Sequence, residues 1–401
     1  MGENRGEMRQ LATIQKIKEI TPIEGKDLIV LLSFYKTGWR VISQKTMEGV
    51  KKDGLVVYIE YDSILPEREE FEFLRKRCFK KNVNGYRISV MKMGGVFSEG
   101  ICFPLSILPD GKYKEGDDVT RILGIEDYET ILAKKTVNVK ELMTKGPWYK
   151  KLIWKYLPWL AFKLWGNNSG LQFPSNYAHK TDETRIQVFP DVIESHRGME
   201  IYITEKMDGS SGTYVFDGKT FYICSRNLTV IKMPISKAKK FYKDGFIFND
   251  KRYYENIAAK YDLPRKMEEF YKEYKYPIAV QGEIVGPNAH DNYYKLQEHE
   301  FFLFDVYNSE TRSYENLKGI KLVADFLGVK TVPLIKEGVL DFKDLNDALS
   351  FAKGNSVVYG GYAREGVVIR AQDPKVVGVS GMVNNRFSLK IINDDYLLKT
   401  M

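Results

Sequence analysis

Between residues 11 and 125 the apolar side chains fall in short runs separated by turn residues, and this pattern limits the fold most strongly. The runs LIVLLSFY, GLVVYIEYDSILP and GYRISVMKMGGVFSEGICFPLSIL are rich in β-branched and aromatic residues, with Gly and Asp nearby. Runs of this kind are typical of short strands joined by turns. A strand-rich unit of about this size favours a small barrel such as an OB-fold.

From about residue 177 onward the pattern changes to strands mixed with helices. The segment GTYVFDGKTFYICS predicts a hairpin around the Asp217-Gly218 turn. Residues 251–274 predict a helix with a break near Pro264, and ENLKGIKLVADFLG and FKDLNDALSFAKG predict two more. The runs IAVQGEIVG, EFFLFDVYN, EGVVIRAQ and RFSLKII return to strand. We therefore expect an α+β chain with domains at residues 1–130 and 177–401, joined by a linker over residues 131–176.

The predicted linker contains an unusual segment, residues 146–166, in which most of the tryptophans of the chain are interleaved with lysines. These residues are Trp148, Trp154, Trp159, Trp165, Lys150, Lys151, Lys155 and Lys163. Pro158 interrupts any single helix here. We favour a linker whose aromatic rings pack between two domains. An amphipathic membrane-surface segment and a basic-aromatic contact to nucleic acid stay open as alternatives.

The composition is that of an ordinary globular protein. The chain has 401 residues, with 43% apolar and 28% charged residues, which allows two domains and a buried core. Its formal net charge of +8 suits a polyanionic partner without demonstrating one. Cys78, Cys102 and Cys224 lie far apart, which predicts a reduced, intracellular protein without disulfides. We expect no signal peptide and no membrane-spanning helix, since no long apolar run occurs.

One lysine has an unusual position for a side chain that usually decorates surfaces. In TEKMDGSSG, Lys206 ends an apolar, strand-like run and is followed by Asp208 and Gly209. A lysine amine is a nucleophile only when neutral, so its pKa must be lowered by burial or by nearby positive charge. We expect the buried strand end to supply burial, and a divalent metal or Arg and Lys neighbours to supply the charge. Such an amine can attack the α-phosphorus of a nucleoside triphosphate, although Lys-x-Asp-Gly alone is a weak signal.

The signal gains weight from companions near the ends of later predicted strands. They are Arg226 in CSRN, Glu283 in VQGEIVG, Phe304 and Asp305 in FFLFDVY, Glu365 in REGVVIR and Lys390 in FSLKIIN. Two such carboxylates can bind Mg²⁺ and ribose hydroxyls, and the cations can offset charge on phosphate. A phenylalanine can stack on a purine, with Phe302 as the rival to Phe304, although an apolar strand position is more often core.

In this order the segments resemble the motifs of the covalent nucleotidyltransferase superfamily, and most nearly those of ATP-dependent RNA ligases related to the second RNA ligase of phage T4. TEKMDGSSGTY resembles motif I, SRN motif Ia, VQGEIVG motif III, FFLFDV motif IIIa, EGVVIR motif IV and FSLKIIN motif V. KTDETRIQ, with Arg185, resembles the stretch that these ligases carry ahead of the nucleophile. The resemblance covers roughly residues 177–398.

The N-terminal half favours one branch of these ligases. YKEGDDVTRILGIEDYE is similar to the end of the OB domain in Naegleria-type RNA ligases, which carry that domain at the N-terminus. We expect no OB domain after motif V, where capping enzymes and many DNA ligases have one. Many ligases also have Lys-x-Lys at motif V, whereas here Ser388 takes the first position. Either motif V aligns with this sequence two residues away from the position used here, or another residue such as Arg386 supplies that phosphate contact.

The resemblance implies an N-terminal OB-fold barrel followed by a nucleotidyltransferase domain of antiparallel sheets flanked by helices. It implies an ATP-dependent RNA ligase that forms AMP on Lys206, transfers it to an RNA 5′-phosphate, and joins that end to a 3′-OH. Implied catalytic residues are Lys206, Asp208, Arg226 and Lys390. Implied nucleotide-binding residues are Arg185, Glu205, Lys206, Arg226, Glu283, Phe304 and Lys390, and Glu283 and Glu365 are implied ligands of Mg²⁺ or Mn²⁺.

Several readings of the partners and role stay open at this stage. We expect RNA with 5′-phosphate and 3′-OH ends, free or in a nicked duplex, no membrane partner, and a monomer in the cytoplasm or in a viral host cell. RNA repair or nick sealing would be the task. A DNA ligase, an mRNA capping guanylyltransferase and a catalytically silent nucleic-acid-binding protein are the alternatives. The basic run RKRCFKKNVNGYR, residues 75–87, is either a patch for the RNA backbone or a solvated loop.

Overall fold

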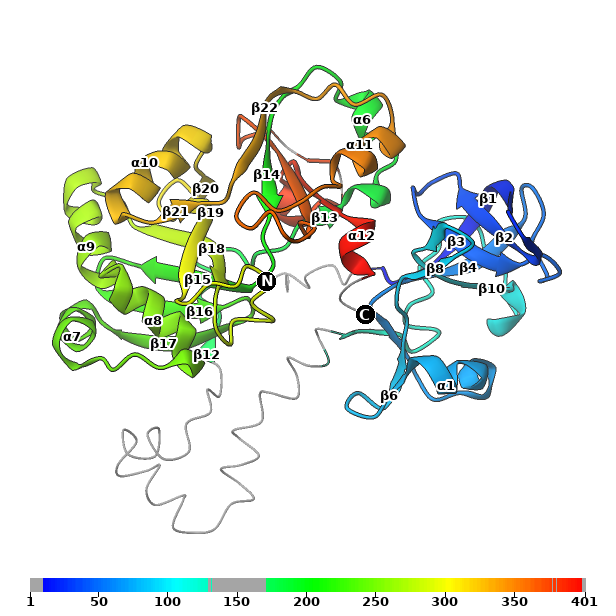
Figure 1. Cartoon of the computed structure of the whole chain (residues 1–401), viewed down its shortest axis with the longest axis horizontal. Coiled ribbons are helices and arrows are strands. Elements are labelled where there is room, and N and C mark those ends of the chain that lie inside the picture. Colours follow the sequence, from blue (N-terminus) through cyan, green and yellow to red (C-terminus); the bar gives the residue numbers. More distant parts are fainter. Residues whose placement is uncertain (1–9, 129–130, 132–170, 377, 380, 399–401) are drawn as a thin grey trace, which may run out of the picture. The chain divides into compact units, whose positions relative to one another are not determined.

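The structure is a computed structural model that describes residues 10–128, 131, 171–376, 378–379 and 381–398 (Figure 1). The tryptophan-rich segment, residues 146–166, lies outside the described residues. The chain forms two compact units. The first comprises Met1–Thr136, Ile186–Asp191 and Leu397–Met401, and the second comprises Val137–Arg185 and Val192–Tyr396. The domain boundaries drawn from the sequence stay a prediction.

The first unit contains a five-stranded antiparallel sheet in the order β10-β4-β1-β2-β3. Its strands are β1 (Ala12–Ile23), β2 (Lys26–Phe34), β3 (Arg40–Gln44), β4 (Leu55–Glu60) and β10 (Gly100–Phe103). The edge strand β10 also contacts β3, so the sheet nearly closes on itself around a core that includes Ile14, Leu32 and Trp39. This near-closed barrel confirms the expected N-terminal OB-fold.

A long insertion connects β4 to β10 and forms small sheets of its own. Its elements are β5 (Ser63–Leu65), η1 (Glu69–Leu74), α1 (Arg75–Cys78), β6 (Phe79–Lys80), β7 (Gly85–Arg87), β8 (Met91–Met93) and β9 (Val96–Ser98). One sheet has the order β11-β5-β7-β6, with β11 at Glu126–Asp127, and β8 pairs with β9. The helix η2 (Leu105–Ile107) follows the barrel. The basic run 75–87 therefore lies on α1 and the β6–β7 hairpin.

The second unit contains two antiparallel-dominated sheets (Figure 1). The larger consists of β12 (Leu171–Gln172), β17 (Leu228–Pro234), β16 (Thr220–Ser225), β15 (Ser210–Phe216), β18 (Ile278–Val285), β19 (Glu300–Asn308) and β20 (Ser313–Tyr314), with β21 (Lys330–Thr331) beside β19. The smaller consists of β13 (Thr184–Arg185), β24 (Ser388–Ile392), β23 (Gly366–Ala371), β14 (Glu200–Lys206) and β22 (Leu334–Val339). This arrangement confirms the expected α+β class.

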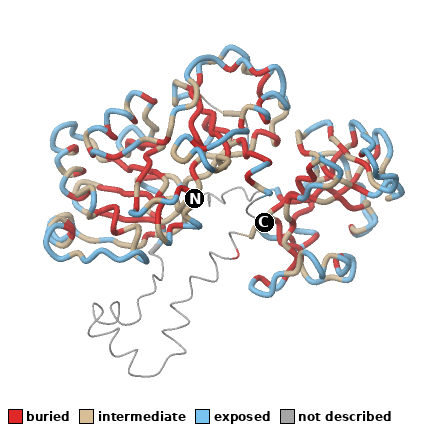
Figure 2. Tube along the Cα trace, viewed as in Figure 1, coloured by how far each residue is buried: buried red, intermediate tan, exposed pale blue. Residues whose placement is uncertain are grey.

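Helices cover the larger sheet and bury its main core (Figure 2). They are α7 (Ile235–Lys240), the π-helical η4 (Phe241–Gly245), η5 (Asp250–Arg252), α8 (Tyr253–Lys260), α9 (Leu263–Tyr274) and α10 (Leu317–Leu327). The unit also contains α6 (Val192–Ser195), α11 (Leu345–Phe351), η6 (Val383–Asn385) and most of α12 (Asp394–Leu397), whereas η3 (Ile186–Val188) belongs to the first unit. The predicted break near Pro264 is confirmed, because Asp262 has a positive φ of 50° and Pro264 lies in the first turn of α9.

The hairpin predicted at Asp217-Gly218 is also confirmed. Asp217 Oδ1 accepts hydrogen bonds from the backbone N–H groups of Lys219 and Thr220, and Gly218 has a φ of 95°. These contacts fix the register in which β15 pairs with β16. Within the described residues, no helix is long and apolar enough to cross a membrane.

Candidate active site

Two close backbone approaches bring the glutamates of both sheets to Lys206. Lys206 ends β14 opposite Gly366 of β23, so Glu365 lies directly beside the lysine. A Cβ at Gly366 would lie 2.1 Å from the carbonyl oxygen of Ile391, which explains the glycine. In the larger sheet, a Cβ at Gly209 would lie 2.3 Å from the carbonyl oxygen of Ile284, so only glycine lets β18 and Glu283 pack so closely.

The amine of Lys206 lies among carboxylates. Its Nζ donates to Glu365 Oε1 at 2.5 Å. Burial lowers the pKa of Lys206, but the attraction of Glu365, Glu283 and Asp208 outweighs burial and leaves the pKa above its ordinary value. The expected effect of burial on this lysine is therefore present, but in the polypeptide alone the neighbouring carboxylates outweigh it and the pKa is not lowered on balance. The amine becomes neutral only if these carboxylates gain another positive partner.

The two glutamates have the properties of ligands for a divalent cation. Burial raises the pKa of Glu283 to about 8, against the attraction of Lys206. Burial also raises the pKa of Glu365, and its Oε2 is buried without a hydrogen-bond partner among the described residues. The unpartnered oxygen of Glu365, with Glu283 nearby, fits Mg²⁺ or Mn²⁺, which need only one or two carboxylates when water and phosphate complete the shell. The described residues hold no cluster of three or more such ligands, so protein side chains alone would not enclose the ion.

Cationic side chains gather next to the carboxylates. Lys390 of β24 lies opposite Arg185 of β13, and its Nζ is 2.9 Å from Asp182 Oδ1. Arg226, from the turn between β16 and β17, reaches the same carboxylate at 3.2 Å. Burial lowers the pKa of Lys390, and Arg185 and Lys206 lower it further, while Asp182 opposes them. The structure therefore brings together three of the predicted phosphate-binding residues, from both sheets.

Asp182 is a member of the site that the sequence did not single out. It lies within KTDETRIQ, but nothing in that stretch shows that one carboxylate would hold both Lys390 and Arg226. These partners are far away in sequence, so only the folded chain reveals the contact.

Asp208 is fixed by three side chains, none of which had been predicted. Its backbone N–H donates to Tyr294 Oη at 2.7 Å, and Tyr396 donates to Asp208 Oδ2 at 2.5 Å. His290 Nδ1 lies 3.2 Å from Asp208 Oδ1. The hydrogen bond to Asp208 raises the pKa of His290 to about 9, despite partial burial. His290 is thus a neighbour of Asp208 that the sequence did not single out.

An apolar cluster beside the lysine provides a surface for a purine base. It comprises Met207, Val285, Tyr294, Phe302 and Val332, with Phe304 packed against them. Phe302 is buried, whereas Phe304 is only partly buried. Exposed ring surface favours Phe304 over Phe302 as the stacking residue, although both lie in the cluster.

Glu205 is the buried polar group nearest to this cluster in sequence. Its Oε2 accepts a hydrogen bond from the backbone N–H of Val357 at 2.8 Å. Its Oε1 is buried and has no hydrogen-bond partner among the described residues. Burial raises the pKa of Glu205. A buried acceptor of this kind calls for an N–H donor from a ligand.

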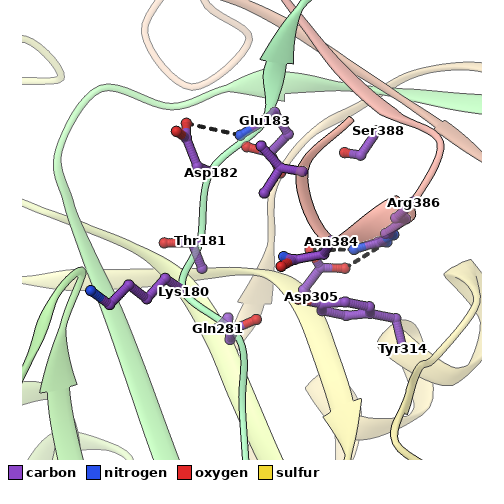
Figure 3. A pocket seen from close by; sticks show the side chains of 11 residues that line it. Lys180, Thr181, Asp182, Glu183, Gln281, Asp305, Tyr314, Asn384, Arg386 and Ser388 are labelled. Carbon is purple, nitrogen blue, oxygen red and sulfur yellow. Dashed lines mark hydrogen bonds and ion pairs between the residues drawn. The ribbon is translucent and has the colours of Figure 1, made fainter. Parts of the chain in front are cut away.

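A buried ion network links Asp305 of β19 to Arg370 of β23 and to Arg386, and Figure 3 shows the Asp305–Arg386 pair. Asp305 Oδ2 accepts from Arg386 Nη1 at 2.9 Å, and Asp305 Oδ1 lies 2.8 Å from Arg386 Nη2. Arg370 donates to Glu183 at 2.7 Å and also lies 3.4 Å from Asp305. Arg386 is thus bound to a carboxylate rather than presented to phosphate, which disfavours it as a substitute at motif V. Ser388 lines the small cavity beside this network.

Comparison with known families identifies the chain. A model of the RNA ligase family matches residues 199–392, and a model of an OB-fold domain matches residues 11–105. Residues 199–392, nearly half of the chain, thus match the RNA ligase family. Every residue of the site just described, apart from the segment around Asp182 and Arg185 and α12, lies within the first of these matches.

Solved structures of a Naegleria gruberi RNA ligase resemble this RNA ligase over nearly its whole length. A lysine-to-alanine variant with ATP and Mn has a TM-score of 0.73 at 25% identity, covering 97% of this chain and 98% of that one. The same ligase with pyrophosphate has a TM-score of 0.72 at 26% identity, covering 98% and 99%. A lysine-to-methionine variant with AMP and Mn also has a TM-score of 0.72. The comparison with curated protein sequences found no match.

Proposed function

We propose that this protein is an ATP-dependent RNA ligase that uses Lys206 as its nucleophile. The observation that carries the proposal is the position of the Lys206 amine, 2.5 Å from Glu365 and in the field of Glu283. The lysine is partly buried, and the two glutamates reach it from different sheets. The solved Naegleria gruberi ligase carries ATP and Mn in one structure and pyrophosphate in another, which supports the same reactants for this chain.

The reaction has three steps, and in each step one bond to phosphorus forms and another breaks. The neutral amine of Lys206 attacks the α-phosphorus of ATP, a phosphoramidate P–N bond forms, the P–O bond to pyrophosphate breaks, and the nitrogen loses one proton as pyrophosphate leaves. An oxygen of an RNA 5′-phosphate then attacks that phosphorus, and the lysine leaves with a proton. Finally a 3′-OH attacks the adenylated 5′-phosphate, its proton is lost, and AMP leaves as the phosphodiester forms.

The cationic side chains would stabilise the phosphates in each transfer. Lys390, Arg226 and Arg185 lie together on one side of the lysine, where negative charge increases in the transition state. In the polypeptide alone, Asp182 pairs with two of these cations, Lys390 and Arg226. Phosphate oxygens of the substrate would replace the carboxylate of Asp182 in those contacts. Asp208, fixed by Tyr294 and Tyr396, would turn the chain beside the nucleotide.

Glu283 and Glu365 would hold a divalent cation, Mg²⁺ or Mn²⁺. Such a cation, when bound, supplies positive charge that favours the neutral amine and offsets charge on the triphosphate. The chain's own contribution is to place both carboxylates beside Lys206. The buried, unpartnered Oε2 of Glu365 supports this assignment.

The carboxylate of Glu205 favours adenine over guanine as the base of the bound nucleotide. Glu205 Oε1 needs a donor, and the exocyclic amino group of adenine is one. Guanine presents a carbonyl at the same place, which would leave two acceptors facing each other. Phe304 would stack on the base. This argument favours ATP over GTP, and so a ligase over a capping guanylyltransferase.

The finer details follow from the three-step chemistry and remain part of the proposal. The substrate would be RNA with 5′-phosphate and 3′-OH ends, free or at a nick in a duplex, and the task would be RNA repair or nick sealing. The enzyme would act as a monomer inside the cell. The linker predicted at residues 131–176 would join the two domains.

The test is to incubate the protein with ATP labelled on the α-phosphate and a divalent cation, then map the adduct. We expect acid-labile AMP on Lys206, no label on Lys206→Ala, and no label from GTP. Label that survives Lys206→Ala refutes the nucleophile, and label from GTP alone indicates a capping enzyme. Sealing of nicks with RNA or DNA 3′-OH strands separates an RNA ligase from a DNA ligase. Nucleic-acid binding without any adduct indicates the silent binding protein.

A further inference from the structure

Four exposed cations lie together on the insertion of the OB-fold unit. They are Lys76 and Arg77 of α1, and Lys80 and Lys81 at the β6–β7 hairpin, and we call them the insertion patch. All four side chains are exposed. The insertion connects β4 to β10, the fourth and fifth strands of the barrel along the chain. OB-folds commonly use this connection to bind oligonucleotides.

The fold neutralises the other cations of the same run but leaves these four without carboxylates. Arg75 pairs with Glu67 and Glu72, and its guanidinium also lies over the rings of Phe79 and Tyr86. Arg87 pairs with Asp62 at 2.8 Å and stacks on Tyr128. No such partner approaches the members of the insertion patch within the described part of the chain. Arg75 and Arg87 are therefore structural, whereas the patch has uncompensated charge.

The patch is displayed on an anchored element and is not a solvated loop. Val83, in the turn of the β6–β7 hairpin, is buried against Ile64 and Ile131. Phe79 at the start of β6 packs against the barrel core and makes an edge contact with Tyr86. Anchoring on both sides of Lys80 and Lys81 reduces the backbone entropy that would be lost on binding a polyanion.

An exposed aromatic ring adjoins the patch. Phe73 of η1 is 68% exposed, three residues before Lys76, and only the edge of the ring meets Phe103. Its exposure leaves the ring available for contact with a ligand. Bases of single-stranded nucleic acid stack on such rings beside cationic grooves.

We propose that the insertion patch is a binding site for the phosphate backbone of the RNA, with Phe73 as a stacking platform for a base. The proposal rests on the proposed function for the choice of RNA as the polyanion. It separates the tasks of the chain: the site at Lys206 performs the chemistry, and the patch contributes affinity for the nucleic acid. Phosphate oxygens would replace water around the four cations and release counterions from the RNA.

The experiment measures RNA affinity as a function of salt. The full chain carries Lys76→Ala, Arg77→Ala, Lys80→Ala and Lys81→Ala, and a fluorescein-labelled, 5′-phosphorylated RNA strand is titrated by anisotropy. If each cation meets one phosphate, the salt slope falls by about 3, since each contact on a single strand contributes roughly 0.7. Because the wild type has the steeper slope, it loses more affinity than the variant as salt rises. The ratio of variant Kd to wild-type Kd would then be about 50-fold smaller at 200 mM salt than at 50 mM salt.

A matched control removes the same charge elsewhere in the same unit. Lys45, Lys51, Lys52 and Lys112 are all exposed and lie outside the insertion, and they are replaced together by alanine. We expect this control to keep most of the RNA affinity and salt slope of the wild type. Phe73→Ala is expected to weaken RNA binding without changing the slope, because stacking releases no counterions.

The outcomes are distinguishable from failure of the proposed function. Formation of lysyl-AMP from ATP without RNA is expected to be unchanged in the patch variant, because the site at Lys206 belongs to the other unit. Calorimetry shows whether the OB-fold unit of the variant still unfolds cooperatively, and Lys80→Ala with Lys81→Ala serves as a milder second variant. Equal Kd values for wild type and patch variant overturn the patch. Equal losses of RNA affinity in the patch variant and in the control also overturn it, because they indicate that RNA binding depends only on the net charge of the unit. A wild type that binds RNA through the patch but never forms lysyl-AMP refutes only the ligase assignment.

Discussion

Removing the carboxylate of Asp305 should destabilise the second unit severely. Asp305 is 3% exposed and holds Arg386 through both oxygens at 2.8 and 2.9 Å. It also lies 3.4 Å from Arg370, which is 2% exposed and whose Nε and Nη1 are buried without hydrogen bonds among the described residues. Among the described residues, Asp305→Ala would leave two buried guanidinium groups with Glu183 as the one carboxylate still paired with them.

The magnitude follows from the burial of the partners that remain. Breaking a buried ion pair by removing one member costs roughly 3–5 kcal/mol, because the other charge stays desolvated. For a unit of this size, that loss lowers Tm by about 10 °C. An exposed pair gives the contrast: Lys336 and Asp341 lie 2.5 Å apart, but the Asp341 side chain is 56% exposed. Asp341→Ala should cost less than about 1 kcal/mol.

The assay is differential scanning calorimetry of the full chain. Tryptophan fluorescence is unsuitable, because Trp39 belongs to the first unit and the other tryptophans lie outside the described residues. We expect Asp305→Ala to lower the transition of the second unit selectively, while Asp341→Ala leaves both transitions nearly in place. A loss below about 1 kcal/mol for Asp305→Ala would show that the arginines find other partners, and would refute the network as a stabilising element.

Three further predictions concern the site. The pKa of His290 is raised to about 9 from 6.5, so its pairing with Asp208 stabilises the fold fully below pH 6.5 and is lost as pH rises through about 9. The stability difference between wild type and His290→Gln should vanish above that pH, and a constant difference contradicts the pairing. Asp182→Asn should lower the pKa of Lys390 further, because the Asp182 carboxylate raises that pKa. The decline of the rate of lysyl-AMP formation at alkaline pH should then begin at lower pH, and an unchanged pH profile argues against a role for charged Lys390. Glu205→Gln should reduce the preference for ATP over GTP in lysyl-nucleotide formation by roughly tenfold to a hundredfold, and an unchanged preference refutes the adenine contact.

Much of the architecture could be predicted because it depends on local patterns. The Asp217-Gly218 turn and the break before Pro264 are properties of a few adjacent residues, and both appear as expected. The order of the motifs along the chain likewise predicted that Lys206, Glu283 and Glu365 would meet. Each lies at or near the end of a strand that pairs in register with the next one.

The electrostatics of the site could not be predicted in the same way. Burial of Lys206 was expected to lower its pKa, but the sign depends on which charges the fold places around the amine. Glu365 lies 159 residues from Lys206 in sequence, and Asp182 lies 208 residues from Lys390. Sequence motifs identify the candidate residues, but they do not show which charged side chains will lie beside them. Contacts between residues so far apart in sequence depend on how the strands pair.

The raised pKa of Lys206 has a consequence for the order of events. Glu365 and Glu283 hold the proton of the amine in the polypeptide alone, because that proton is the nearest positive charge available to them. They can release it only when another positive charge satisfies both carboxylates, so the nucleophile forms together with the loaded site and not before it. The same coupling protects the chain, since an amine that stays protonated among carboxylates does not react with stray electrophiles. Substituting Glu283 or Glu365 removes a ligand of the proposed cation, whose charge is needed to displace the proton from the amine. Such a substitution should impair lysyl-AMP formation far more than it impairs the sealing of RNA that is already adenylated, a step in which Lys206 is not proposed to be the nucleophile.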